Sequence, residues 1–134
     1  MSDSAPPSDT NGRRTILVVD DEPSVRAIVL ASIRVRGTRY GVIEAGNGAD
    51  ALAQARRAQP DLVLLDVALP DHDGFWVCRQ LKTAADTASI PVIMLTAMSL
   101  QSDREQALAA GADGYIVKPF SPRALIEELD RRLG

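Results

Sequence analysis

Residues 62–66 read Leu-Val-Leu-Leu-Asp, four consecutive apolar residues that end at once in a carboxylate. A short, uninterrupted apolar run is typical of a strand buried on both faces, as in a parallel sheet. The same arrangement occurs three more times, in residues 16–19 followed by Asp20-Asp21-Glu22, residues 92–95 followed by Thr96, and residues 115–117 followed by Lys118. The pattern predicts parallel strands that each end in a polar side chain.

Segments with helical periodicity lie between these runs, at residues 23–37, 48–58, 74–84, 103–110 and 122–133, and residues 40–45 predict a weaker edge strand. Pro23 suits the first turn of a helix, and Gly37 and Gly111 suit helix ends. Strands and helices therefore alternate along the chain, which implies right-handed crossovers. The sequence predicts one α/β domain with a doubly wound, five-stranded parallel sheet.

Particular helical side chains can be assigned to the inside or the outside of this domain. Leu52 is expected on the inner face of its helix, and Cys78 is expected to be an inert thiol in the core. In the last helix, Glu127 with Arg131 and Glu128 with Arg132 have the i,i+4 spacing of ion pairs on an outer face.

Length and composition limit the classes of protein to consider. The chain has 134 residues, which suffices for one domain, and its net charge of −3 gives no reason to expect direct contact with nucleic acid. The single cysteine favours a reducing cytoplasm, and no apolar run is long enough to span a membrane. Residues 1–14 predict a disordered lead-in, so we expect the domain at residues 15–134.

The polar residues at the strand ends suggest chemistry when they are taken together. The carboxyl ends of parallel strands lie along one edge of the sheet, so Asp20, Asp21 and Asp66 are expected to lie close together. Such carboxylates repel one another unless a cation lies among them, and hard oxygen ligands with open coordination positions suit Mg²⁺. Lys118 offers a positive charge and Thr96 a hydrogen-bond donor to a phosphoryl group. Each residue alone could simply end a strand or cap a helix, but the full set predicts a phosphoryl site.

Four segments together resemble the receiver domain of bacterial two-component response regulators. They are ILVVDDEPSVR (16–26), PDLVLLDVALPDHDGF (60–75), IPVIMLTA (90–97) and AGADGYIVKPF (110–120). The resemblance extends over almost the whole chain after the lead-in, and five separated sites agree in identity, order and context. It implies a (βα)5 flavodoxin-like fold with strand order 2-1-3-4-5.

The resemblance also implies how the acidic residues act. Asp66 is expected to accept a phosphoryl group from a phosphohistidine of a sensor histidine kinase or a histidine phosphotransfer protein. Asp21 is expected to bind Mg²⁺ directly, with Mn²⁺ as an alternative ion, and Asp20 to hold the metal largely through water. The backbone carbonyl of Ala68 is expected to complete the protein ligands.

A second group of residues is implied to contact the phosphoryl group or to respond to it. Thr96, Ala97 and Lys118 are expected to bind it, and Tyr115 is expected to change rotamer when the threonine moves. The Lys118–Pro119 peptide bond is implied to be cis.

Three interpretations of the whole chain remain open at this stage. It could be a stand-alone receiver, a receiver fragment of a longer regulator or hybrid kinase, or an aspartyl-phosphate phosphohydrolase. Such hydrolases carry a second acid two residues after the nucleophile, and that position is Ala68 here. We therefore expect a phosphoacceptor that assists its own phosphorylation and dephosphorylation, and not an enzyme that turns over a separate substrate.

The resemblance further implies a route of output. Phosphorylation should remodel the surface formed by the fourth helix, fifth strand and fifth helix, which would contact a downstream protein unless the phosphoryl group is relayed onward. Receivers of winged-helix transcription factors dimerise through this face with acids where this chain has Gly114 and Ala124, and an arginine where it has Glu128. We therefore expect a monomer or a weak dimer.

Overall fold

The computed structural model describes residues 14–35, 40–97 and 101–133. Its five strands form one parallel sheet in the order β2-β1-β3-β4-β5, as predicted. The strands are β1 (Arg14–Val19), β2 (Tyr40–Ala45), β3 (Leu62–Asp66), β4 (Val92–Thr96) and β5 (Gly114–Val117). The helices are α1 (Pro23–Arg34), α2 (Gly48–Ala58), α3 (Gly74–Thr83), α4 (Gln101–Ala109) and α5 (Pro122–Leu133).

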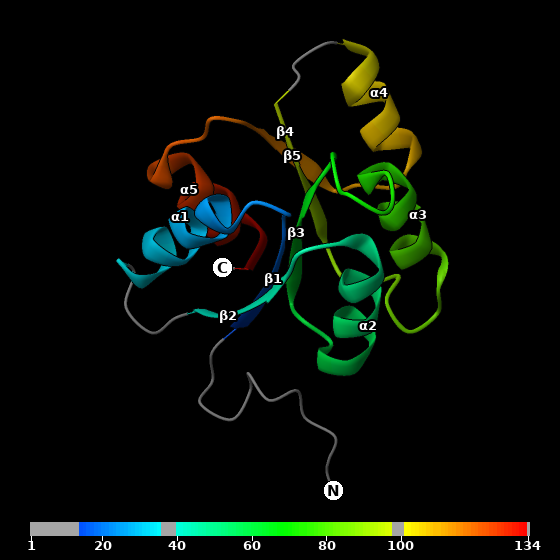
Figure 1. The fold of residues 1–134 in the computed structure, drawn as a ribbon, viewed down its shortest axis with the longest axis horizontal. Coiled ribbons are helices and arrows are strands. Elements are labelled where there is room, and N and C mark those ends of the chain that lie inside the picture. The colour runs from blue at the N-terminus through cyan, green and yellow to red at the C-terminus, as the bar shows by residue number, and fades with distance from the viewer. Residues whose placement is uncertain (1–13, 36–39, 98–100, 134) are drawn as a thin grey trace, which may run out of the picture.

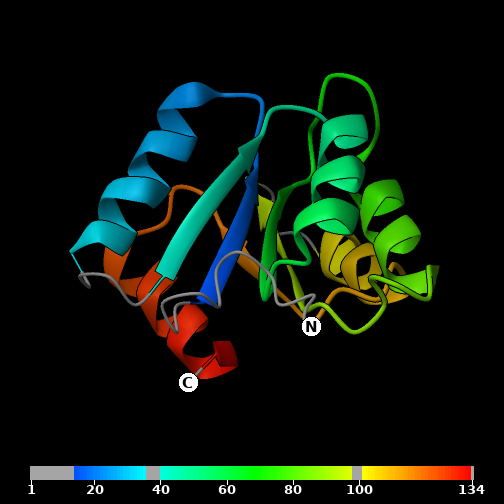
Figure 2. The ribbon, with the colours of Figure 1, turned by 90° about the horizontal axis from the view of Figure 1, so that it is seen from below.

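The sheet separates two layers of helices. Helices α1 and α5 cover one face, and α2, α3 and α4 cover the other (Figures 1 and 2). Successive residues of β1 serve both sides, because Leu17 and Val19 pack toward α2 and α3 whereas Ile16 and Val18 pack toward α1 and α5. This double coverage explains why the apolar runs are continuous and do not alternate. No helix in the described ranges is long and apolar enough to cross a membrane.

The sheet begins one residue before the predicted domain boundary. Arg14 already belongs to β1, where it pairs with Tyr40 of β2, and its guanidinium lies 3.7 Å from Asp61. Strand β1 thus includes Arg14, the last residue of the predicted lead-in. The rest of the predicted lead-in, residues 1–13, and the predicted helix end at Gly37 lie outside the described residues.

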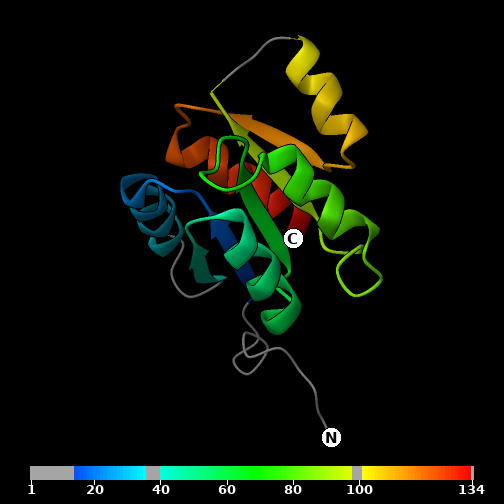
Figure 3. The same cartoon turned by 45° about the vertical axis from the view of Figure 1, so that its right-hand side comes forward.

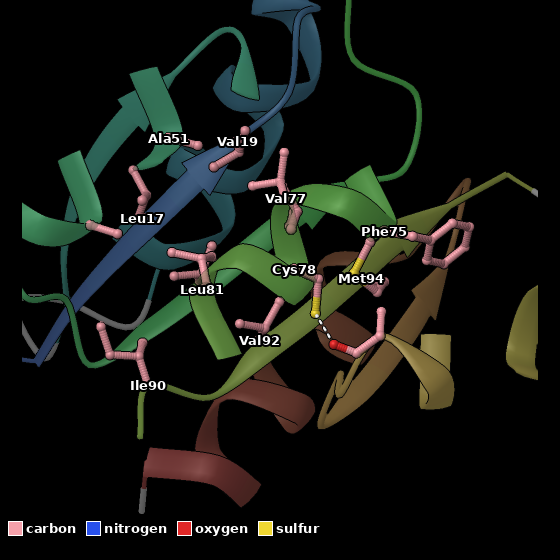
Figure 4. Packing of buried hydrophobic residues seen from close by; sticks show 14 of the residues in the cluster. Leu17, Val19, Ala51, Phe75, Val77, Cys78, Leu81, Ile90, Val92 and Met94 are labelled. Carbon is pink, nitrogen blue, oxygen red and sulfur yellow. Dashed lines mark hydrogen bonds between the residues drawn. The ribbon is translucent and has the colours of Figure 1, made fainter. Parts of the chain in front are cut away.

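The core between the sheet and α3 contains the single cysteine. The Cys78 thiol is buried and contacts the backbone carbonyl of Ala110 at 3.5 Å (Figure 4). Burial raises the pKa of this thiol to about 11, because the thiolate would have to lose its hydration. The buried location predicted for Cys78 is confirmed, and the high pKa disfavours the reactive thiolate.

Helix α2 packs on the sheet through small side chains. Ala51, Ala55 and Ala58 are buried, whereas Leu52 is only half buried at the edge of the cluster. Leu52 contacts the core as predicted for the inner face, but it is only partly buried. The alanines are the residues of this helix that are fully covered by the sheet and its neighbours.

The ion pairs of α5 also differ from the prediction. Glu128 is only 9% exposed and pairs with both Arg131 (2.9 Å) and Arg132 (3.1 Å), while Glu127 pairs with Arg123 instead of Arg131. Glu128 can lie inward because Gly114 leaves room over β5, where an added Cβ would be 3.3 Å from the Glu128 carboxylate. Only the Glu128–Arg132 pair was predicted correctly.

The loop after β3 is tied to the neighbouring helices, α2 and α3, which lie side by side (Figure 3). The Asp71 carboxylate accepts hydrogen bonds from the backbone N–H groups of Gly48 (2.7 Å) and Ala49 (2.9 Å) at the start of α2. These bonds hold the pKa of Asp71 below its ordinary value. His72 stacks on Trp76 of α3, with ring centroids 4.3 Å apart. The loop that follows Asp66 is thereby anchored on both sides.

The loop packs tightly against Gly74, the first residue of α3. A Cβ at Gly74 would lie 2.2 Å from the carbonyl oxygen of Asp66 and 2.7 Å from the Cα of Val67, so backbone would have to move. We expect Gly74→Ala to lower the free energy of unfolding by about 1–3 kcal/mol, measured by urea denaturation. Gly46→Ala is the matched control, because its nearest atom would lie at an ordinary 3.7 Å. Equal losses in the two variants would contradict this packing argument.

Candidate functional site

Three carboxylates converge at the carboxyl edge of the sheet. Asp20 and Asp21 follow β1, and Asp66 ends β3, which is the next strand in the sheet. One oxygen of each lies within 4.8 Å of the others. Asp20 and Asp66 are buried and Asp21 is exposed. The proximity predicted from the parallel strand ends is therefore present, with one acid open to solvent.

Lys118, which follows the edge strand β5, neutralises part of the charge of this cluster. The Lys118 ammonium lies 2.7 Å from Asp20 Oδ2 and 3.2 Å from Asp66 Oδ1. Its backbone N–H donates to the carbonyl of Thr96 at 2.7 Å, which continues the pairing of β4 with β5, and the following bond to Pro119 is cis. The pairing of β4 with β5 thus places the Lys118 side chain within reach of both Asp20 and Asp66.

The electrostatics of the cluster follow from burial and crowding. Burial raises the pKa of Asp66 above its ordinary value, the charge of Asp20 raises it further, and Lys118 and the N–H of Ala68 offset this in part. Burial alone would lower the pKa of Lys118, but its hydrogen bond to Asp20 and the charges of both acids raise it. The charged form of Lys118 is therefore favoured, and the charged form of Asp66 is disfavoured by its surroundings.

The donor set fits a small, hard divalent cation. Asp20 already accepts a bond on each oxygen, from the N–H of Glu22 (3.0 Å) and from Lys118 (2.7 Å). Asp21 is exposed beside it, so the open side of the cluster offers carboxylate oxygen together with room for water. Mg²⁺ prefers this combination, because it keeps several waters and uses few carboxylates.

The other predicted residues lie around the same end of the sheet at different depths. Thr96 is buried at the end of β4, and Ala97 is exposed just after it. Tyr115 on β5 is turned outward, with the Arg104 guanidinium carbon 5.4 Å from its ring centroid. Ala68 is exposed in the loop after β3. The direct contacts therefore join the acids and Lys118, while Tyr115 lies toward α4.

A buried acid of α4 was missed by the sequence reasoning. Asp103 is only 7% exposed, and its Oδ2 has no hydrogen-bond partner in the described part of the protein. With Thr96 and Tyr115 it lines a cavity of about 10 Å³, which is roughly the room that one water needs. An acid in the first turn of a helix is ordinary in sequence, so no signal distinguished this one.

A second residue that the sequence reasoning missed is Arg26 of α1. Its guanidinium donates to the backbone carbonyl of Asp20 at 2.5 Å and to Glu44 of β2 at 2.8 Å. A helical arginine one turn after an acidic loop is usually a solvated residue, so the sequence offered no reason to single it out.

The family follows from comparison with known proteins. The model of the response regulator receiver domain matches residues 16–130. The chain belongs to this family. Among curated relatives, the probable transcriptional regulator ycf27 of Porphyridium aerugineum is 47% identical over 113 residues, covering 84% of this chain and 45% of that protein. The transcriptional regulatory protein ResD of Bacillus subtilis is 42% identical over 118 residues, covering 88% of this chain and 47% of its own length.

Solved structures agree with the family. The chemotaxis protein CheY4 of Vibrio cholerae has a TM-score of 0.84 at 33% identity and covers 91% of this chain and all 100% of its own. The receiver domain of the sensor histidine kinase PA1611 of Pseudomonas aeruginosa was solved with magnesium in its active-site cleft. It has a TM-score of 0.81 at 35% identity, and the match covers 90% of this chain and 98% of that one. The receiver described here spans less than half the length of the two curated relatives.

Receiver domains bind Mg²⁺ in an acidic pocket, and in this receiver Asp20, Asp21 and Asp66 form a cluster of carboxylates. Receiver domains of this family are signalling switches of two-component systems. The prediction of a receiver domain is thereby confirmed.

The raised pKa of Asp66 predicts a pH-dependent cost to stability. An acid whose folded pKa is raised carries its full cost to stability above that pKa, and the cost declines as the pH falls from there to the ordinary pKa of the unfolded chain. Without divalent cation, we expect Asp66→Asn to unfold at a higher urea concentration than the wild type at pH 7. The variant loses the costly buried charge, while Lys118 keeps its ion pair with Asp20. The difference should shrink as the pH falls.

The control for this measurement is Asp86→Asn, which removes an exposed charge between α3 and β4 and should leave the urea midpoint nearly unchanged. A lower urea midpoint for Asp66→Asn than for the wild type at pH 7 would contradict the conclusion that the buried Asp66 charge destabilises the fold.

Proposed function

We propose that this receiver is a phosphoacceptor switch in which Asp66 takes a phosphoryl group from a phosphohistidine of a sensor histidine kinase or histidine phosphotransfer protein. The observation that supports this most is the Asp66 carboxylate, held 3.2 Å from the Lys118 ammonium inside a cluster of three acids. A carboxylate in this place is positioned as a nucleophile, with positive charge available for the oxygens it would acquire.

Each residue has a part in the proposed transfer. Asp66 attacks phosphorus as the P–N bond breaks, and the electron pair of that bond remains on the imidazole of the donor. Lys118 moves its contact toward a phosphoryl oxygen, and the Thr96 hydroxyl and the backbone N–H of Ala97 donate to others. A bound Mg²⁺, or Mn²⁺ in its place, would neutralise charge on the phosphoryl oxygens. Asp20, Asp21, Asp66 and the carbonyl of Ala68 would hold it.

The proposed output is a protein contact. The face of α4, β5 and α5 carries the exposed apolar side chains Leu108, Tyr115 and Val117. Tyr115 lies in β5 and Lys118 directly follows that strand, so a change at the phosphoryl site would reach this face over a short path. A net charge of −3 does not favour DNA, so we assign no nucleic-acid contact to the receiver itself and place it in the cytoplasm with its kinase.

The phosphoacceptor assignment predicts a single labelled residue. With acetyl phosphate and Mg²⁺, intact-protein mass spectrometry should show addition of one phosphoryl group, and Asp66→Asn should abolish it because an amide is not a nucleophile there. Undiminished labelling of the variant at another residue would refute the assignment. Asp86→Asn is the control that should label normally. Sustained release of product from a generic phosphomonoester would instead indicate a phosphohydrolase.

The oligomeric state tests the proposed output. We expect the receiver to remain monomeric in Mg²⁺ with or without beryllofluoride, a phosphoryl mimic, in sedimentation velocity runs. Gly114 and Ala124 supply no acids for the inter-subunit ion pairs of winged-helix regulators, and Glu128 is already paired within its own helix. A tight symmetric dimer through α4, β5 and α5 would overturn the proposal.

A further inference from the structure

Arg26 holds the peptide bond between the two acids that follow β1. Its guanidinium Nη1 donates to the carbonyl of Asp20 at 2.5 Å, and that carbonyl belongs to the peptide that joins Asp20 to Asp21. The same guanidinium donates through Nε to Glu44 of β2 at 2.8 Å. The Arg26 side chain is mostly buried, at 19% exposure. Two separate bonds to one planar group fix both the position and the orientation of the guanidinium.

The other atoms of Asp20 are fixed as well. Its N–H donates to the carbonyl of Ala45 at 3.1 Å, and its carboxylate accepts from Glu22 N–H and from Lys118. The carboxylate of Asp21 differs, because it is exposed and accepts no hydrogen bond from any residue that the structure describes. The direction in which Asp21 leaves the strand is therefore set by the peptide plane that Arg26 holds.

We propose that Arg26, oriented by Glu44, is a positioning residue that aims the Asp21 carboxylate at a divalent cation. The inference rests on the proposed function, since it concerns the metal used in that transfer. Arg26 touches neither phosphoryl group nor metal in this arrangement; it acts through the Asp20–Asp21 peptide. Outer residues that orient metal ligands typically contribute 10–100-fold to affinity.

Two simpler accounts of Arg26 make different predictions. If Arg26 only tied α1 to β2, its removal would lower stability and leave the intrinsic affinity for Mg²⁺ unchanged. If it acted only as a positive charge near the cluster, its removal would strengthen Mg²⁺ binding, because a like charge would be lost. A positioning residue predicts weaker binding in spite of the lost charge. The sign of the change in affinity therefore separates the three.

The experiment is titration calorimetry of the folded receiver with MgCl₂. We expect Arg26→Gln to weaken Mg²⁺ binding by roughly tenfold, at the lower end of the range for outer residues. Arg26→Lys keeps the charge but cannot hold the carbonyl and Glu44 with one planar group, so it should also weaken binding. Glu44→Gln should weaken it less. Arg34→Gln, an exposed arginine at the far end of α1, is the control with the same charge change and should bind as tightly as the wild type or slightly more tightly.

Unchanged or tighter binding in Arg26→Gln or Arg26→Lys would overturn the inference. Circular dichroism and thermal melts establish that each variant is folded; if Arg26→Gln does not fold, Arg26→Lys and Glu44→Gln decide. Failure of the proposed function has a different result, since the wild type itself would then neither bind Mg²⁺ nor be labelled at Asp66. Wild-type binding and labelling, combined with Arg26 variants that bind equally well, would reject the positioning role alone.

Discussion

The contact of the Lys118 ammonium with Asp20 and Asp66 is the interaction on which the site depends. Parallel strands bring three carboxylates to one edge, where two of them are buried, and without a cation their repulsion would be hard to accommodate. Lys118 supplies that cation at 2.7 and 3.2 Å. The arrangement leaves Asp66 strained by burial and by Asp20, so the acid gains from any added positive charge or from conversion into a better-accommodated group.

The same contact joins the site to the surface where output is proposed. Lys118 ends the segment that contains β5, and its N–H bonds the carbonyl of Thr96 in β4. Tyr115 lies on β5 paired with Met94, and it shares a small cavity with Thr96 and Asp103, whose Oδ2 has no hydrogen-bond partner among the described residues. In the proposed output, a rearrangement of Lys118 or Thr96 would reach Tyr115 through adjacent residues of two strands.

Several details of packing could not be obtained from spacing. Leu52 was expected on the inner face of α2, where it does contact the core, but the fully buried residues of that face are the alanines. Glu128 was expected on the outer face of α5, but the space above Gly114 admits it inward, where it pairs with two arginines. Both outcomes depend on the volume left by a neighbouring element, which one-dimensional periodicity does not contain.

The sequence pattern by itself determined the class of fold and the identity of the residues at the carboxyl edge, and the order of the strands was implied by the resemblance to the receiver family. Continuous apolar runs require a doubly covered parallel sheet, and such a sheet gathers the residues that end its strands. Only the tertiary structure decided the contacts among them. Lys118 and Asp20 are 98 positions apart, and Arg26 and Glu44 are 18 apart, so each pair meets only after the sheet has assembled. Distances, burial and the raised pKa of Asp66 arise from that meeting, because charge interactions depend on separation and solvent access and not on order along the chain.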